Sequence, residues 1–336
     1  MQQSRRRPLG DIGNTYAGAH PLHAAKPEAA TTTSTTKPRP PACEFKVRSV
    51  VGTGPTVLTA SSPASPRVDE KNKRIALHVT EYLKEIFEHF HEAEQKPRCS
   101  VTYMTRIQTD VNEKMRTILV DWLVDVHLKF KLLPETLFLA VEIIDRFLDK
   151  KVVSRQKLQL VGVVAMLLAA KYEEIYPPEV KDFIYIAANT YTRDDILRME
   201  RLMFATLEFN LTVPTVYVFL QRGLQVMEAD TKTRQLAQYL AELSLLDYKL
   251  LAYAPSLIGA SCIYLANKYV GAQEPWSRVL EYYSQYKQSD IEKCAADLLT
   301  VSQNAPTQKT QAVRKKYSYA KYGEVAKLTQ TSIQIP

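Results

Sequence analysis

Apolar residues return at helical spacing along most of the chain. From residue 75 they recur every three or four positions, at Ile75, Val79, Tyr82, Leu83, Ile86 and Phe90. This is the period of an amphipathic helix. The helical period continues to about residue 303, and no convincing run of alternating apolar and polar residues, which would indicate strands, occurs. We therefore predict an all-α body.

The beginning of the chain lacks any apolar period. Residues 1–74 are rich in Pro, Thr, Ser, Ala and Gly, with TTTSTTKPRPP at 31–41 and SSPASPR at 61–67. Such a segment cannot bury enough apolar surface to offset the entropy lost on ordering. We predict a disordered tail over 1–74, followed by an N-terminal helix within 75–100.

A weak internal repeat divides the body into two similar parts. A shift of 97 residues aligns LVG at 160–162 with LIG at 257–259, LAAKY at 168–172 with LANKY at 265–269, and Thr136, Leu139 and Ala140 with Thr233, Leu236 and Ala237. The alternative is that small and large apolar residues simply recur in helical cores. The repeat predicts two helical domains that meet at Val213–Pro214, because the residue before proline is disfavoured in a helix.

The most apolar run is too short to cross a membrane. It extends over 160–170, ends at Lys171, and is well below the roughly 20 residues that a bilayer requires. No secretory signal is apparent, so we expect a soluble intracellular protein. Lys171 suits a helix end, where a cation complements the helix dipole. The alternative is that Lys171, with Glu173 and Glu174 nearby, contacts a partner.

Charge and chemistry exclude several functional classes. The net charge of +8 lies in the tails, because residues 1–74 carry +7, residues 306–336 carry +5 and residues 75–305 carry −4. A slightly acidic body disfavours direct nucleic-acid binding. The four cysteines lack metal-ligand spacing, and phosphate-binding loops, HExxH and CxxC are absent from the sequence. We expect no cofactor, no metal and no catalytic activity.

The segment MRTILVDWLVDV at 115–126 is apolar on two sides of a helix. Its wider apolar arc consists of Met115, Ile118, Leu119, Trp122, Leu123 and Val126. A helix of this kind is either central in its domain or buried on one side and used for binding on the other. Arg116 falls among the apolar positions and requires a carboxylate, for which Asp145 is the expected partner. We predict a structural ion pair between Arg116 and Asp145.

Two stretches resemble the first cyclin box of a mitotic cyclin. They are MRTILVDWLVDVHLKFKLLPETLFLAVEIIDRFL at 115–148 and KLQLVGVVAMLLAAKYEEIYPPEVKDFIYI at 157–186. AELSLLDYKLLAYAPSLIGASCIYLA at 241–266 is similar to the more divergent C-terminal cyclin fold. HLKFKLLPETL favours the B type, although A-type members share most of the remainder. The resemblance covers roughly residues 75–325.

The resemblance implies a fold and a division of the chain. Two tandem five-helix cyclin-box domains are expected, preceded by the N-terminal helix and the disordered tail. The boundaries are a first box over 101–212, a C-terminal cyclin fold over 213–305 and a basic extension over 306–336. The implied function is to bind and activate a cyclin-dependent protein kinase by repositioning its mobile helix and activation loop. Catalysis belongs to the kinase.

The resemblance also implies residue roles. Lys171 and Glu200 match the residues that hydrogen-bond the kinase, with Tyr172 as the neighbouring aromatic residue, and Arg116 and Asp145 match the family's buried ion pair. The exposed patch that docks Arg-x-Leu peptides of substrates and inhibitors matches Met115, Ile118, Leu119 and Trp122, with Asp125 to receive the arginine and Gln159 as an accessory polar residue. Asp125 is one methylene shorter than the usual glutamate, and Thr117 replaces the usual alanine.

The tail contains a motif of the same family. RRPLGDIGN at 6–14 fits the destruction-box pattern RxxLxxxxN, with Arg6, Leu9 and Asn14 at the defining positions. This implies recognition by the anaphase-promoting ubiquitin ligase and proteolysis at mitotic exit. Ser62 and Ser65 each precede a proline and are candidate phosphorylation sites.

The expected function is a B-like mitotic cyclin that drives G2/M progression, present in nucleus and cytoplasm according to the cell cycle. One alternative is a transcription-associated or DNA-binding protein with the same paired boxes, which would need a basic body. A second is a viral or parasite-type cyclin that escapes proteolysis, against which the pattern at Arg6–Asn14 argues.

Overall fold

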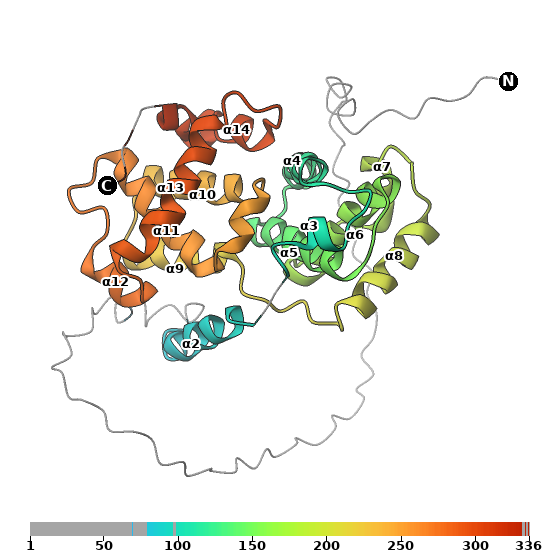
Figure 1. Cartoon of the computed structure of the whole chain (residues 1–336), viewed down its shortest axis with the longest axis horizontal. Helices are drawn as coiled ribbons and strands as arrows, with labels where there is room; N and C mark the ends of the chain where they lie inside the picture. The colour runs from blue at the N-terminus through green and yellow to red at the C-terminus, as the bar shows by residue number, and fades with distance from the viewer. Residues whose placement is uncertain (1–68, 70–78, 97–98, 331–332, 334, 336) are drawn as a thin grey trace, which may run out of the picture.

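The computed structural model describes residues 69, 79–96, 99–330, 333 and 335. These residues form helices joined by turns and loops, and no strand occurs among them. The prediction of an all-α fold is confirmed. Figure 1 shows the two helical domains side by side, with the N-terminal helix beneath the second domain.

The first domain is a bundle around one buried helix. Its helices are α4 (Glu113–Phe130), α5 (Pro134–Lys150), α6 (Arg155–Glu173), α7 (Val180–Ile186) and α8 (Arg193–Thr206). Every residue from Leu158 to Ala170 in α6 is buried. The run that is apolar on all sides is therefore a central core helix, packed chiefly on α5, α8 and α4.

The second domain repeats the plan of the first. It comprises α9 (Val216–Val226), α10 (Thr231–Ser244), α11 (Pro255–Val270), α12 (Arg278–Ser284) and α13 (Gln288–Asn304), with a 3₁₀ turn, η3 (Tyr248–Ala252), between α10 and α11. α11 takes the place of α6, packing on α9, α10 and α13. The shift of 97 residues thus superposes equivalent helices, and the predicted pair of five-helix boxes is confirmed over the described part of the chain.

Local sequence explains where several helices begin and end. The Asn112 side chain caps α4 by accepting a hydrogen bond from the Met115 amide at 3.0 Å. Pro134 and Pro255 occupy the first turns of α5 and α11, where their missing amide hydrogen is not needed. At the other end of α4, Lys131 adopts a left-handed conformation with φ of 56°, which stops the helix.

The N-terminal helix α2 (Leu83–Glu94) lies against the second domain. Phe87 and Phe90 contact the ring of Phe219 with centroids 6.3 and 6.4 Å apart. Glu94 ends the helix inside the domain, where its carboxylate accepts hydrogen bonds from the Ser256 hydroxyl at 2.7 Å and amide at 3.1 Å. The described part of the predicted helix is thus held by aromatic contacts and a buried carboxylate.

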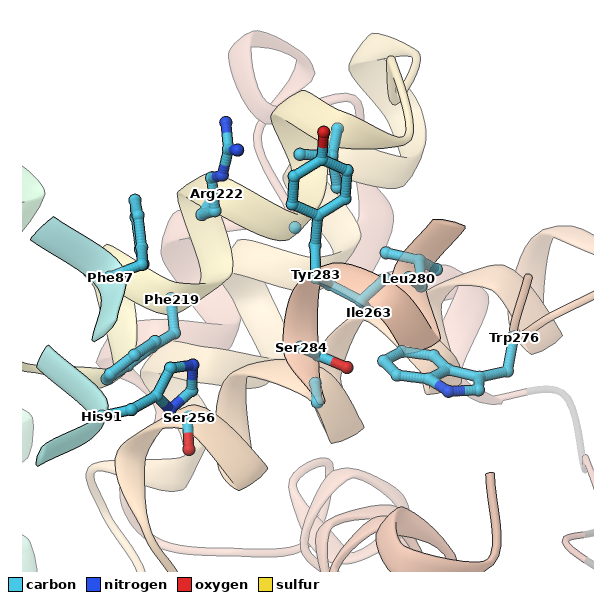
Figure 2. A pocket seen from close by; sticks show the side chains of 13 residues that line it. Phe87, His91, Phe219, Arg222, Ser256, Ile263, Trp276, Leu280, Tyr283 and Ser284 are labelled. Atoms are coloured by element: carbon cyan, nitrogen blue, oxygen red, sulfur yellow. The ribbon is translucent and has the colours of Figure 1, made fainter. Parts of the chain in front are cut away.

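A buried arginine of the second domain holds Asp69 and packs against α2. The guanidinium of Arg222 in α9 donates two hydrogen bonds of 2.7 Å to Asp69 and lies over the rings of Phe87 and Tyr283. Figure 2 shows this arginine between Phe87 and Tyr283, beside a cavity of about 30 Å³. A cavity of that size holds no more than one or two waters, so these residues fasten α2 and form no ligand pocket.

The C-terminal segment folds back over the junction of the domains. It contains α14 (Ala312–Lys316) and two 3₁₀ turns, η4 (Ala320–Tyr322) and η5 (Val325–Gln330). Lys316 and the hydroxyl of Tyr317 bind the buried carboxylate of Glu242 in α10 at 2.5 and 2.8 Å. α14 also packs against α4 of the first domain, beside which it lies in Figure 1.

Candidate functional site

Lys171 and Glu200 meet on the surface of the first domain. Lys171 lies in the last turn of α6, as expected, and its Nζ is 2.7 Å from Oε1 of Glu200 in the middle of α8. The carboxylate side chain is largely covered, at 13% exposed, whereas that of the lysine is 43% exposed. An ammonium group has three donors, so two remain for a partner while the carboxylate orients the group.

Apolar side chains around this pair are unusually open to solvent. Ile175 and Tyr176, in the loop after α6, are 86% and 91% exposed, and Tyr172 is also exposed. The hydroxyl of Tyr172 lies 2.5 Å from that of Thr212, which fixes its ring. The resemblance indicated Tyr172, whereas Ile175 and Tyr176 were not predicted. Their signal is the IYPP segment, because the prolines prevent its side chains from entering a helix core.

The loop that presents these side chains is braced from α5. The carboxylate of Glu174 accepts hydrogen bonds from the Leu133 amide at 2.7 Å and the Thr136 hydroxyl at 2.6 Å. Burial, together with the charges of Glu135 and Glu174, raises the pKa of Glu173. The hydrogen bonds of Glu174 thus fix the end of α6 and the start of the loop that follows it. We name the surface formed by Lys171, Tyr172, Ile175, Tyr176 and the partly covered Glu200 the α6–α8 face.

The predicted peptide-docking patch lies on α4. Met115, Ile118 and Trp122 are partly exposed and lie on one side of this helix. Leu119 differs from the expectation of an exposed residue, because it is fully buried. It packs over Gly162 of α6, where an added Cβ would come within 2.7 Å of the Leu119 Cδ1. Leu119 therefore lies beneath the patch and supports the side chains that reach solvent.

Gln159 lies in the first turns of α6, the helix that packs against α4. It is 8% exposed, and its Oε1 accepts a hydrogen bond of 3.4 Å from the Tyr191 hydroxyl. Its Nε2 has no partner among the described residues. A buried amide donor without a partner is costly, and a bound ligand can supply the missing acceptor.

Two carboxylates mark the far end of the patch. Asp125 is exposed one helical turn beyond Asp121, and burial raises the pKa of Asp125, an effect that the charge of Lys315 opposes. Burial also raises the pKa of Asp121, to about 6. The Ala312 amide donates a hydrogen bond of 2.9 Å to this carboxylate and has the opposite, smaller effect on the pKa. The resemblance indicated Asp125 but neither Asp121 nor Lys315, because the proximity of these residues depends on how the C-terminal segment folds back.

A cleft of about 820 Å³ borders the start of α4. It is lined by α4 at Glu113, Thr117 and Ile118, by η3, and by the end of α13 with the loop that follows it. Ile118 belongs to both the cleft and the docking patch. The cleft and the docking patch are therefore adjacent on α4 and share one apolar residue.

The predicted ion pair holds the first domain together from within. Arg116 and Asp145 are each 1% exposed, and the guanidinium donates to both carboxylate oxygens at 2.6 and 2.7 Å. The Tyr103 hydroxyl donates to the same carboxylate at 2.8 Å, and a third guanidinium hydrogen bond, of 2.9 Å, reaches the carbonyl of Leu245 in the second domain. The pair is structural in its position and also joins the two domains.

Other predicted sites lie outside the described residues. Arg6, Leu9 and Asn14 of the destruction box, and the candidate phosphorylation sites Ser62 and Ser65, all belong to that part of the chain. Within the described ranges, no His, Cys, Asp and Glu side chains cluster closely enough to hold a metal ion. None of the described helices is long and apolar enough to span a membrane.

Comparison with known proteins identifies the family. The model for the N-terminal domain of cyclins matches residues 85–212, and the model for the C-terminal domain matches residues 214–331. The G2/mitotic-specific cyclin-2 of Medicago sativa is 44% identical over 260 residues, which cover 77% of this chain and 79% of that protein. The chain belongs to the cyclin family.

The relatives of this cyclin include B-type members from plants. Cyclin-B2-2 of Arabidopsis thaliana is 41% identical over 259 residues, 77% of this chain. The aligned region spans 60% of that protein, so the chain matches about three fifths of its length. The two family matches meet at residue 213, and the second continues past residue 305 to 331, so it takes in most of the segment that the sequence analysis set apart as an extension.

Solved structures share the fold of this cyclin. A viral cyclin from herpesvirus saimiri superposes with a TM-score of 0.57 at 20% identity, covering 64% of this chain and 97% of the viral one. A chain of the yeast RNA Pol II CTD kinase complex CTDK-1 superposes with a TM-score of 0.53 at 13% identity, covering 63% and 73% of the two chains. The similarity lies in the arrangement of helices.

Proposed function

We propose that this cyclin binds and activates a cyclin-dependent protein kinase to drive G2/M progression and mitosis. The observation that carries the proposal is the α6–α8 face, where a partly covered Lys171–Glu200 pair lies among exposed Ile175 and Tyr176. Large apolar side chains exposed beside oriented polar groups are typical of a protein-binding surface. The membership of a similarly folded chain in a yeast kinase complex supports the same partner class.

Activation follows from binding energy alone. The face is rigid because α6 is the core helix of its domain and Glu174 braces the loop that follows it. A rigid surface that contacts only the active arrangement of a kinase shifts the kinase population toward that arrangement. The cyclin supplies no catalytic group, and phosphoryl transfer takes place on the kinase.

A second part of the proposal concerns substrate docking. Met115, Ile118 and Trp122 accept the leucine of an Arg-x-Leu peptide, Asp125 receives its arginine, and the free amide of Gln159 bonds its backbone. The geometry supports this assignment because the apolar surface and the exposed carboxylate lie on α4, and the unsatisfied amide donor lies on α6, which packs against α4. Kinase binding and substrate docking then occupy different surfaces of the first domain.

Turnover through the tail is the third part. RRPLGDIGN at 6–14 has the pattern of a destruction box, which supports recognition by the anaphase-promoting ubiquitin ligase. We expect the Arg6→Ala and Leu9→Ala double variant to persist as cells leave mitosis, and unaltered turnover contradicts this part. Fractionation of dividing cells tests the associated expectation that the protein occupies nucleus and cytoplasm in a cell-cycle-dependent way.

Co-purification from dividing cells, followed by mass spectrometry and a kinase assay, tests the proposal. A cyclin-dependent kinase is expected with the wild type and is expected to be depleted with the Lys171→Glu variant. A matched control is Lys150→Glu, because Lys150 is another exposed lysine paired with a glutamate, Glu208, and lies at the end of α5. Equal recovery of the kinase with both variants contradicts the assignment of the face.

A DNA-binding or transcription-associated function is the competing candidate. Residues 75–305 carry a net charge of −4, which disfavours affinity for a phosphate backbone. An electrophoretic shift of DNA by the full chain at moderate salt would favour this candidate over kinase activation.

A further inference from the structure

α14 is fixed between the two domains at the acidic end of the docking patch. The Ala312 amide ties its start to Asp121 of α4 at 2.9 Å. Lys316 and Tyr317 tie its end to the carboxylate of Glu242, and the side chains of that ion pair are 4% and 2% exposed. With anchors on both sides, the short helix holds the intervening residues in one position beside α4.

Lys315 lies between these two anchors and projects into solvent. Lys315 is exposed. Burial raises the pKa of both Asp121 and Asp125, and the positive charge of Lys315 partly offsets this rise. The amides of Gln311 and Ala312 already engage Asp121. Asp125 is therefore the carboxylate available to a ligand. Lys315 follows Ala312 by one turn of α14, and Asp125 follows Asp121 by one turn of α4, so the packing of α14 on α4 brings the lysine to the side of the patch that carries Asp125.

We propose that Lys315 is a specificity-determining residue of the docking site, acting as a built-in competitor for the arginine of the bound peptide. A ligand arginine at Asp125 meets the repulsion of this lysine as well as the attraction of the carboxylate. Lys315 therefore reduces the gain in affinity that arginine gives a peptide over an uncharged residue. The choice between peptides then depends more on contacts with the apolar patch of Met115, Ile118 and Trp122. This inference rests on the proposed docking of Arg-x-Leu peptides.

The test compares two peptides on the full chain by fluorescence anisotropy. One carries Arg-x-Leu, and the other replaces arginine with citrulline, which has nearly the same shape and no charge. We expect Lys315→Ala to tighten binding of the arginine peptide by about threefold to fivefold, as for a partly exposed charge interaction. The citrulline peptide should bind equally to both proteins. In an Asp125→Asn background, Lys315→Ala should give a smaller gain, because the carboxylate no longer holds the ligand's arginine near the lysine.

Two control variants separate charge from structure. Lys315→Arg keeps the charge and should behave as the wild type. Lys293→Ala removes one exposed charge from α13, where it is not among the groups that act on Asp121 or Asp125, and should leave both peptides unaffected. Equal thermal unfolding of all variants shows that α14 remains in place.

The outcomes distinguish the inference from the function on which it rests. If Trp122→Ala abolishes binding of the arginine peptide while Lys315→Ala changes nothing, docking stands and the role of Lys315 is overturned. An equal gain for both peptides also overturns it, because the effect is then independent of the ligand's charge. If neither the wild type nor Lys315→Ala binds either peptide, both proposals fail.

Discussion

The hydroxyl of Thr117 donates a hydrogen bond of 2.9 Å to the carbonyl of Leu246, which joins helix α4 of the first domain to the second domain. The resemblance to cyclins marks Thr117 only as a departure within the docking motif. The structure gives the hydroxyl a structural contact, beside the guanidinium of Arg116 that binds the neighbouring carbonyl of Leu245. Two adjacent side chains of α4 thus hold two adjacent carbonyls across the domain junction.

Replacing Thr117 by valine should destabilise the junction without changing side-chain size. We expect a loss of about 1 kcal/mol in the free energy of unfolding, the typical net value of one intramolecular hydrogen bond. Urea unfolding of the full chain measures it. Thr300→Val is the matched control, because that hydroxyl donates only to Ala296 within its own helix. Equal effects of the two substitutions would show that the contact with Leu246 contributes nothing.

Removing the Asp145 carboxylate should be far more damaging. Asp145→Ala leaves the guanidinium of Arg116, which is 1% exposed, without its ion-pair partner. Breaking a buried pair in this way costs about 3–5 kcal/mol. Tyr103→Phe removes only one hydrogen bond to the same carboxylate and should cost about 1 kcal/mol. Thermal unfolding that ranks the two variants in the opposite order would contradict the assigned roles.

His127 should make the protein sensitive to mild acid. Burial, followed by the charge of Lys316, lowers the pKa of His127 to about 4 from its ordinary value of 6.5. A lowered pKa favours the neutral ring in the folded state, so its stabilising contribution is complete above pH 6.5 and is lost as the pH falls toward 4. At pH 5 the folded protein should have lost up to about 2 kcal/mol from this group.

His127→Gln isolates that contribution. Glutamine can still donate to the carbonyl of Leu133, which the ring nitrogen contacts at 3.0 Å, but does not titrate. We expect the stability difference between wild type and variant to move in favour of the variant between pH 7.5 and 5. The comparison is needed because Asp121, with a pKa of about 6, acts in the opposite direction over the same range. A difference independent of pH would show that His127 does not titrate in this window.

Sequence patterns predicted the all-α fold and the buried ion pair for physical reasons, whereas the residues of the two proposed surfaces came from the resemblance to cyclins. The run at 160–170 was predicted not to cross a membrane, because it has fewer apolar residues than a bilayer requires and lies within the region of helical periodicity. Arg116 and Asp145 could be paired because a cation among apolar positions requires a carboxylate. Both inferences need only the spacing of apolar and charged residues along a helix, which the sequence shows directly.

The remaining features depend on contacts between distant segments. Leu119 shares an apolar arc with Trp122, yet it is buried because Gly162 lets α6 approach α4 closely. Lys315 belongs to a run of basic residues that looks like a solvated tail, and only the anchoring of its neighbours brings it beside Asp125. Exposure of Ile175 and Tyr176 follows from the path of the chain after α6, which periodicity does not describe.

Kinase binding through the α6–α8 face is tested most directly by a charge exchange. In the double variant Lys171→Glu and Glu200→Lys, an ion pair remains on the surface but its polarity toward a partner is reversed. Because the pair is partly exposed, the free energy of unfolding should change by less than about 1 kcal/mol. The measurement is the affinity of the purified full chain for a cyclin-dependent kinase, with the stimulated phosphorylation rate. We predict a loss of about tenfold or more in affinity, with a parallel loss of stimulation. Unchanged affinity and stimulation would contradict the proposed interface.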